Sequence, residues 1–277
     1  MKETSLQLNK KEHNYHYPHG RGKVSHPVHP GFKVIISFFT PLVIITAVSF
    51  LTEHINFSLD IPWPLVFRAS IETLSRLFIA YGLSVICAFF LAVSITSNKL
   101  FERIFLPIFD VIESIPVLAF LPLIVSFFIS MHLENGAAIF ILCISMMWSI
   151  LFTVIGGIKL IPSDIKNMAQ VYNISKINYI WHILFPAVIP EIVTGSMLAL
   201  AAGWNILIVA EAIHLYVPLG YRGGDLTGLG SLLINSSASG NMTMFYVALA
   251  TMTIIIAIIN IMVWQPLLSY AEKFRFE

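Results

Sequence analysis

Long runs of apolar residues without a charged side chain follow one another along the chain. A helix needs about 20 such residues to cross the hydrocarbon core of a bilayer, and the runs lack the alternation of polar and apolar residues that marks strands of a membrane β-barrel. The pattern predicts an all-α fold, a polytopic membrane helix bundle with six transmembrane helices. The spans are expected at about residues 34–52, 77–98, 107–130, 136–157, 190–211 and 244–264, within a transmembrane domain of residues 34–271.

The composition supports a membrane protein. Apolar residues make up 57% of the chain and charged residues 11%, whereas a soluble globular domain carries about 25% charged residues. The net charge of +1 provides no basic surplus for binding nucleic acid. Cys87 and Cys143 lie inside apolar runs, where a packing role is the default and no disulfide is implied.

The distribution of positive charge predicts an orientation. With six spans both termini lie on one side, and all but three of the 16 lysines and arginines fall there; the exceptions are Arg68, Arg76 and Arg222. Because cytoplasmic loops carry the excess of these residues, residues 1–33 and 272–277 are expected to be cytoplasmic tails. The first span has no small-residue cleavage site and is expected to be retained, in a multi-pass protein of the plasma (inner) membrane.

Residues 1–33 contain five of the nine histidines. Such a tract can bind a metal ion, or it can be a disordered, positively charged arm beside the membrane. No cysteine or carboxylate cluster completes a site there. We therefore favour the disordered arm and expect no metal.

Residues 159–187 are expected to form a structured cytoplasmic loop. Pro162 followed by Ser163 and an aspartate is a helix-start pattern, in which the serine hydroxyl caps free amides and the aspartate complements the positive helix end. The first helix should run to about Tyr172. Asn173 can then adopt the left-handed conformation of a tight turn.

A second helix is expected after Ser175, whose hydroxyl can cap it. Pro186 should stop or kink the chain before the fifth span. The pattern fits two interpretations equally well: an element that docks a soluble partner, and a surface helix that only covers the bundle. The apolar residues at helical spacing are Ile177, Ile180, Trp181 and Leu184.

The loop resembles the hallmark loop of permease subunits of ABC importers. The family motif reads Glu-Ala-Ala, three residues, Gly, nine residues, Ile, one residue, and Leu-Pro. This chain keeps the spacing, with replacements at the Glu, the first Ala, the Gly and the Leu. Asparagine for glycine at the turn is a mild change, whereas loss of the glutamate removes any ion pair that the family's glutamate makes. The residues aligned with the motif are Asn167, Met168, Ala169, Asn173, Ile183, Phe185 and Pro186.

The resemblance continues to the C-terminus. Residues 110–128 and 201–213 resemble the nitrate, sulfonate and taurine branch of these permeases. Residues 228–233 and the last residues of the chain most resemble the second half of fused anion-type permeases. This likeness suggests a partner permease encoded separately, and both a heterodimer and a homodimer are open.

The resemblance implies partners and a mode of action. Such permeases pair with a second permease, bind two ATPase subunits through the loop, and receive substrate from an extracytoplasmic substrate-binding protein. This chain has no Walker A segment, so it is expected not to be an enzyme and to bind no cofactor; ATP and Mg belong to the partner ATPase. ATP would then switch the permease pair between inward-open and outward-open states.

Ionisable residues at membrane depth are costly and often functional. Asp110 and Glu113 lie on one helical face, with Pro116 beyond them. Catalysis is not expected, because no nucleophile, histidine or metal-ligand set accompanies them. For Glu113, lining of the pathway and pairing with a neighbouring helix are both open.

The fifth expected span carries Glu211 at its end, one to two turns after Trp204 and Asn205. Packing is favoured for Trp204, and a hydrogen bond to a neighbouring helix for Asn205, over contact with substrate. Small residues make this span the candidate for the dimer axis or pathway wall. They are Gly195, Ser196, Ala199, Ala201, Ala202 and Gly203.

Arg68, Glu72 and Arg76 are spaced four residues apart at the expected outer start of the second span. Alternating charges at this spacing stabilise an exposed helix by roughly a few tenths of a kcal/mol per pair. We favour this structural role over attraction of an anionic substrate or docking of a binding protein.

The favoured function is therefore the membrane-spanning permease subunit of an ATP-driven importer, with a small anion of the nitrate, sulfonate or taurine type as cargo. The alternative is a self-sufficient secondary carrier or channel. A carrier is expected to have ionisable residues at the membrane midplane or an inverted repeat, and neither is clear in this sequence.

Overall fold

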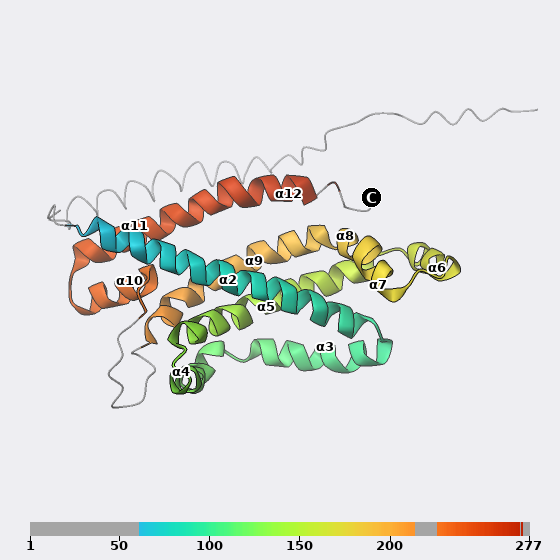
Figure 1. Ribbon diagram of the computed structural model, residues 1–277, viewed down its shortest axis with the longest axis horizontal. Coiled ribbons are helices and arrows are strands. Elements are labelled where there is room, and N and C mark those ends of the chain that lie inside the picture. The colour runs from blue at the N-terminus through green and yellow to red at the C-terminus, as the bar shows by residue number, and fades with distance from the viewer. Residues whose placement is uncertain (1–60, 214–225, 272, 274–277) are drawn as a thin grey trace, which may run out of the picture. The chain divides into compact units, whose positions relative to one another are not determined.

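The computed structural model describes residues 61–213, 226–271 and 273. All regular elements in this part are helices, which confirms the all-α fold (Figure 1). The expected first span, residues 34–52, lies outside the described residues, as do both tails apart from Lys273.

Four helical segments are long and apolar enough to cross a membrane, and a bent helix pair is a fifth if its two parts form one span. This agrees with a polytopic membrane helix bundle. The four segments are α2 (Trp63–Thr96), α5 (Glu134–Leu160), α9 (Ile189–Glu211) and Met242–Ala271, which comprises α11 (Met242–Ile259), the π-helix η4 (Asn260–Trp264) and α12 (Gln265–Ala271).

The span expected at about residues 107–130 is not one unbroken helix. The structure divides this stretch into two helical parts bent by 76°. Ile115 has an extended conformation with ψ 123°, because the ring of Pro116 disfavours helical geometry at the residue before it. The parts are α3 (Lys99–Ser114), the 3-10 helix η1 (Val117–Phe120) and α4 (Leu121–Ser130).

Helix α2 begins at Trp63 rather than at the expected residue 77. The charge-free run covers only the later part of this helix, because its first turns carry charged residues. Pro64 fits the first turn, where its missing N–H leaves no hydrogen bond unmade. Arg68 and Arg76 consequently lie inside a long helix.

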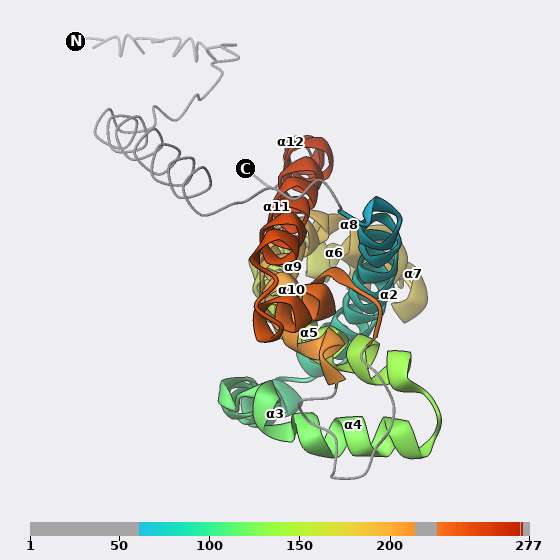
Figure 2. The same ribbon diagram turned by 90° about the vertical axis from the view of Figure 1, so that its left-hand side faces the viewer.

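Helix α5 packs against both α2 and α9 and forms the centre of the bundle (Figure 2). Two glycines of α9 allow its close approach to α5. A Cβ on Gly195 would overlap Thr153 Oγ1, and one on Gly203 would lie 2.8 Å from Met146 Sδ. The close contact predicted from the small residues of this span is confirmed at these two positions.

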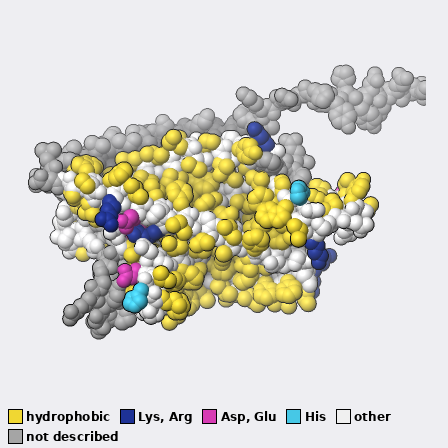
Figure 3. Space-filling view, in the orientation of Figure 1, with side chains coloured by type: hydrophobic (Ala, Val, Ile, Leu, Met, Phe, Trp, Pro, Cys, Tyr) yellow, Lys and Arg dark blue, Asp and Glu magenta, His cyan; other side chains and the backbone are white. Residues whose placement is uncertain are grey.

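The outward faces of the long helices are apolar. Phe67 and Met262 are 70% and 72% exposed. Hydrophobic side chains cover the middle of the face in Figure 3, and charged side chains lie towards its ends. Such a belt is suited to lipid or to partner helices within a bilayer.

Two helical segments continue through a proline because a wider π-helical turn precedes it. A π-helix precedes Pro186, and η4 precedes Pro266. Proline cannot donate the i→i−4 hydrogen bond and its ring crowds that carbonyl, and a π turn relieves the conflict. The break expected at Pro186 falls instead at Val188 (φ −100°, ψ 4°). The remaining helices are α6 (Ser163–Val171), α7 (Lys176–Tyr179), the π-helix η2 (Ile180–Leu184), α8 (Phe185–Ala187) and α10 (Leu229–Ala238).

Candidate functional site

The segment from α6 to α8 extends past the ends of α2 and α5, and we name this part of the bundle the loop end (Figure 1). Helix α6 ends at Val171 and Asn173 has a positive φ of 48°, as predicted. Ser175 Oγ accepts a hydrogen bond from Asn178 N at 3.4 Å, which confirms the expected cap. The cap expected from Ser163 is wrong: this residue is already the first of α6, so its side chain cannot lie ahead of the free amides.

The residues of the loop motif divide between an outward and an inward side of α6. Asn167 and Met168 are exposed, whereas Ala169 is buried. Met168, Val171 and Tyr172, which are 57%, 78% and 74% exposed, form what we name the apolar tip. Exposed apolar groups that cluster in this way mark contact sites. Of the other motif residues, Asn173 is exposed and Ile183, Phe185 and Pro186 are half-buried.

The stripe expected on the second helix is not one buried face. Ile177 and Trp181 are largely exposed, whereas Leu184 is buried. The π turn breaks the 3.6-residue period on which the prediction depended. The ring centroid of Trp181 lies 5.7 Å from that of Phe185 and 6.4 Å from that of Phe89 in α2. These rings attach the loop to the bundle.

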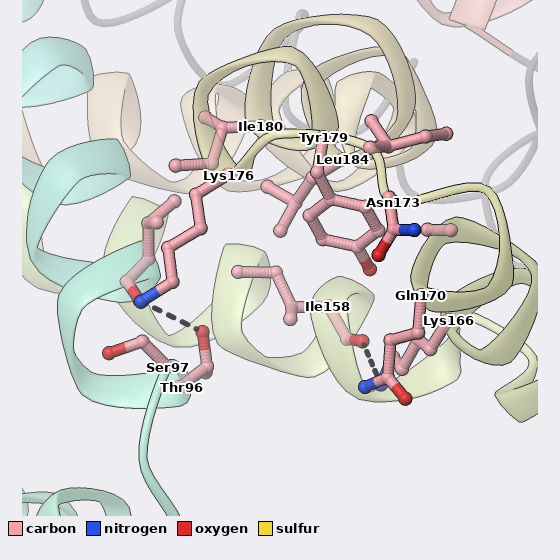
Figure 4. Close-up of a pocket in the computed structure, with 13 residues that line it drawn as sticks. Thr96, Ser97, Ile158, Lys166, Gln170, Asn173, Lys176, Tyr179, Ile180 and Leu184 are labelled. Carbon is pink, nitrogen blue, oxygen red and sulfur yellow. Dashed lines mark hydrogen bonds between the residues drawn. The ribbon is translucent and has the colours of Figure 1, made fainter.

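A pocket of about 700 Å³, named here the loop pocket, lies at the loop end (Figure 4). Figure 4 shows Lys176 extending towards Thr96 and Ser97 on one side, and Lys166 beside Gln170 on the other. Burial raises the pKa of the Tyr179 hydroxyl in its wall, so this group is neutral. The other lining residues are Val93, Ile158, Ala169, Asn173, Ile174, Ile180 and Leu184.

The opposite end of the bundle holds a buried ion pair. Arg76 of α2 and Glu211 of α9 are 5% and 0% exposed, and Arg76 Nη1 donates to Glu211 Oε1 at 2.8 Å. The same guanidinium donates to Asn135 Oδ1 at 2.9 Å, to Thr227 O at 2.8 Å and to Glu72 Oε2 at 3.1 Å. Buried charges are tolerated when they are paired and hydrogen-bonded in this way. We name the pair and the groups bonded to it the clasp.

The clasp also holds the start of α10. Thr73 Oγ1 donates to Glu211 Oε1 at 2.8 Å and accepts from Leu229 N at 2.9 Å. Gly230 N donates to Glu211 Oε2 at 2.8 Å. The first amides of a helix lack partners within it and favour negative charge, so Glu211 caps α10 from another helix. A Cβ on Gly228 would overlap the Glu211 carboxylate, which requires glycine there.

The interpretation of Arg68, Glu72 and Arg76 as one exposed charged face is wrong for Arg76, which is buried in the clasp. It holds for Arg68, which is 72% exposed and pairs with Glu72 at 2.9 Å. Sequence reasoning missed the pairing of Arg76 with Glu211 and the role of Thr73. One feature of the sequence could have indicated the pair: Arg76 and Glu211 are opposite charges in two separate apolar helices, and charges in such helices usually pair.

The structure does not bring the remaining predicted residues into one site. Glu113 and Pro116 are exposed near the break after α3, and Glu113 forms no ion pair with another described residue. Trp204 is buried, as its expected packing role requires, while Asn205 is exposed and bonds no described neighbouring helix. Ala201 is likewise exposed and Ala202 half-buried. Among the described residues no cluster of His, Cys, Asp and Glu could hold a metal ion.

Residues 80–268 match the family described as binding-protein-dependent transport system inner membrane component. The match covers more than half of the chain, so the chain belongs to this family. With its long apolar helices, it is a multi-pass protein of the plasma membrane.

Curated relatives make the likeness more specific. The chain is 31% identical over 159 residues to the nitrate import permease protein NrtB of Leptolyngbya laminosa, covering 57% of this chain and 56% of that protein. It is 28% identical over 148 residues to the bicarbonate transport system permease protein CmpB of Synechococcus elongatus, covering 53% and 52%. The taurine transport system permease protein TauC of Escherichia coli is 25% identical over 149 residues, covering 54% and 53%. The chain spans about half the length of the curated relatives it matches, and the predicted branch of the family is confirmed.

Proposed function

We propose that this chain is the membrane-spanning permease subunit of an ATP-driven ABC importer for a small anion. The observation that carries the proposal is the apolar tip on a structured loop beyond the end of an apolar bundle. Exposed apolar side chains on a structured element in water are unfavourable unless a partner covers them. Membership of a family of transport components makes an ATPase the fitting partner.

The residues of the loop motif then have distinct roles. Asn167 and Met168 contact the ATPase, while Ala169 packs the loop on the bundle and Asn173 turns the chain. Ile183, Phe185 and Pro186 connect the loop to α9. Two ATPase subunits supply the energy with their own ATP and Mg, so this chain is a transport subunit and not an enzyme.

Movement of the loop would reach the transmembrane helices by a short path. Only Val188 separates α8 from α9. The ring centroid of Phe185 lies 5.4 Å from that of Phe89 in α2. The clasp joins the far ends of the same two helices through Arg76 and Glu211. Force on the loop would thus tilt α2 and α9 about a fixed end, which couples two states of the pathway to the ATPase cycle.

The exposed face of α9 is the proposed contact with the pathway or with the second permease. Thr194, Leu198, Ala201 and Asn205 are exposed and recur at helical spacing. A polar amide facing lipid is costly, which favours a partner helix or a water-filled pathway there. Glu113 is a second pathway candidate.

Six spans with both termini in the cytoplasm would put the loop end in the cytoplasm, where ATP is available. The clasp would then face an extracytoplasmic substrate-binding protein. The relatives named for nitrate, bicarbonate and taurine support a small anion as cargo. The second permease would be either another copy of this chain or a related one.

The test is copurification of the ATPase with the detergent-solubilised chain from its native membrane. Met168→Asp places an unpaired carboxylate in the proposed contact and should reduce ATPase recovery at least about tenfold. Met242→Asp makes the same change at an exposed residue of the opposite end and should leave recovery unchanged.

Elution volume and thermal unfolding confirm that each variant is folded. Equal ATPase recovery with Met168→Asp and the parent would remove the apolar tip as the contact. If no ATPase accompanies the parent under conditions that preserve complexes, the secondary carrier or channel becomes the better hypothesis.

A further inference from the structure

The loop pocket is a surface separate from the apolar tip. It lies on the side of α6 that faces the ends of α2 and α5 (Figure 4). Ala169 lines it, whereas Met168 does not. Its volume of about 700 Å³ lies within the usual range of ligand sites, about 300–1,000 Å³.

The charge of the loop pocket has one sign. Its charged lining residues are Lys166 and Lys176, and no aspartate or glutamate of the described chain lines it. Lys166 Nζ makes a long contact of 3.5 Å with Ile158 O, and neither lysine forms an ion pair with a described residue. An anion at either lysine would therefore gain a cationic partner without breaking an existing ion pair.

The wall between the two lysines is apolar. Ile158, Leu184 and the ring of Tyr179 lie there in Figure 4, and Ile180 also lines the pocket. The hydroxyl of Thr96 already donates to Ala92 O within its own helix. The lysines are the charged donors of the pocket, beside the side-chain amides of Gln170 and Asn173 and the hydroxyl of Tyr179. A well-matched ligand combines a negative group with an apolar part.

We propose that the loop pocket binds a phosphate-bearing amphiphile, with its phosphate at one of the two lysines, Lys166 or Lys176, and its apolar part against Ile158, Ile180 and Leu184. The pocket lies at the ends of membrane helices, where lipid headgroups are found. An anionic phospholipid is therefore the nearest source, and a phosphate compound from the aqueous phase shares the charged group. A bound ligand would lie between α6 and the bundle and hold the loop at a set distance from α2 and α5.

The test measures binding directly on the full chain in detergent. Native mass spectrometry would follow titration with dihexanoyl phosphatidylglycerol, dihexanoyl phosphatidylcholine and inorganic phosphate. Phosphatidylglycerol should bind at least about tenfold more tightly than phosphatidylcholine, because only the first carries a net negative charge. The double variant Lys166→Gln/Lys176→Gln should lose at least about tenfold in affinity for phosphatidylglycerol.

Two further variants control for charge and for shape. Lys99→Gln removes the same charge from an exposed lysine outside the pocket and should leave affinity unchanged. Val93→Phe narrows the apolar wall from α2 and should weaken phosphatidylglycerol but not inorganic phosphate. Thermal unfolding of each variant confirms that it is folded.

The outcomes separate the possible sources. Displacement of the lipid by inorganic phosphate, with the same lysine dependence, assigns the site to an aqueous phosphate compound; lack of displacement assigns it to lipid. Equal binding of the two lipids, or an equal loss with Lys99→Gln, overturns the proposal. Unchanged phosphatidylglycerol affinity in the variant Lys166→Gln/Lys176→Gln overturns it as well. Because neither transport nor ATP hydrolysis is measured, a failure here is distinct from a failure of the permease function.

Discussion

At one end of the bundle Arg76 and Glu211 are buried and bonded from several sides. At the other end Lys166 and Lys176 line an open pocket, and none of its described lining residues carries a carboxylate. The clasp joins α2, α5, α9 and the start of α10, and in the described part of the chain no buried side-chain nitrogen or oxygen lacks a partner. The loop end is attached by the aromatic contacts of Trp181 and Phe185 and by apolar side chains such as Leu184 that pack in the core.

This difference separates a fixed end from an adjustable one. Charges withdrawn from water are stable in one geometry, because a small displacement leaves them unpaired in a low-dielectric surrounding. Apolar and aromatic contacts depend less on direction than a buried ion pair does, so a small displacement costs them less free energy. Elements that move in coupling come from such weakly held regions, so the loop end is suited to transmit force and the clasp to resist it.

Breaking the clasp should have the largest effect. Arg76→Met leaves Glu211 as a buried charge without its cationic partner and should lower the free energy of unfolding by about 3–5 kcal/mol. Denaturant titration in detergent measures this. Adding Glu211→Gln to that variant should recover part of the loss, since no charge is then left unpaired; equal or greater instability of the double variant would contradict the ion-pair account.

Closing the space beside Glu211 should have an intermediate effect. Gly228→Ala adds a methyl group where the carboxylate lies, and the required shift should cost about 1–3 kcal/mol of unfolding free energy. Gly82→Ala is the matched control, because nothing lies within 4 Å of its added Cβ and alanine favours the helix. The same titration measures both variants. Equal stability would show that the start of α10 does not lie as close to the Glu211 carboxylate as the structure has it.

Backbone strain introduced at the loop end should destabilise only the loop. Asn173 has φ 48°, a conformation that costs most residues about 1–2 kcal/mol, so Asn173→Val should speed proteolysis between α6 and α7 without changing the stability of the clasp. Asn173→Gly should behave like the parent. A fall in global stability with Asn173→Val as large as with Gly228→Ala would remove the distinction between the two ends.

The smallest effect is expected where the clasp reaches the surface. Arg68 is 72% exposed, and its one ion pair with a described residue is that with Glu72, so Arg68→Gln should change the unfolding free energy by no more than about 0.5 kcal/mol. A loss approaching that of Arg76→Met, in the same denaturant titration, would mean that the surface pair is part of the buried network.

The sequence predictions are most accurate for features that depend on residues close together in the chain. The span expected at residues 190–211 agrees with α9 to within one residue at its start, because an apolar run and its terminal charge are adjacent in the chain. The turn at Asn173 depends on one residue's tolerance of positive φ and was also predicted. The bend at Ile115 was not predicted, although Pro116 was noted. The apolar run continues without a charge across the proline, and run length alone does not show where a helix is broken.

The buried network depends on residues far apart in the chain and was not predicted. Thr73 and Glu211 are 138 residues apart in the chain, and nothing local to either indicates that they share a hydrogen bond. The glycine at residue 228 could be noted in the sequence, but its purpose depends on a carboxylate brought by α9. Such pairings arise only when helices pack.

Family membership, the helical membrane character and the turn of the loop are therefore readable from residue order, because apolar run length, residue spacing and single-residue backbone preference act within a few residues. Packing of distant helices decides which charges meet, where a helix wall leaves a pocket, and which face of the loop stays exposed. Burial is a property of the assembled bundle, and it is burial that makes Arg76 structural while Arg68, two turns away on the same helix, stays in contact with water.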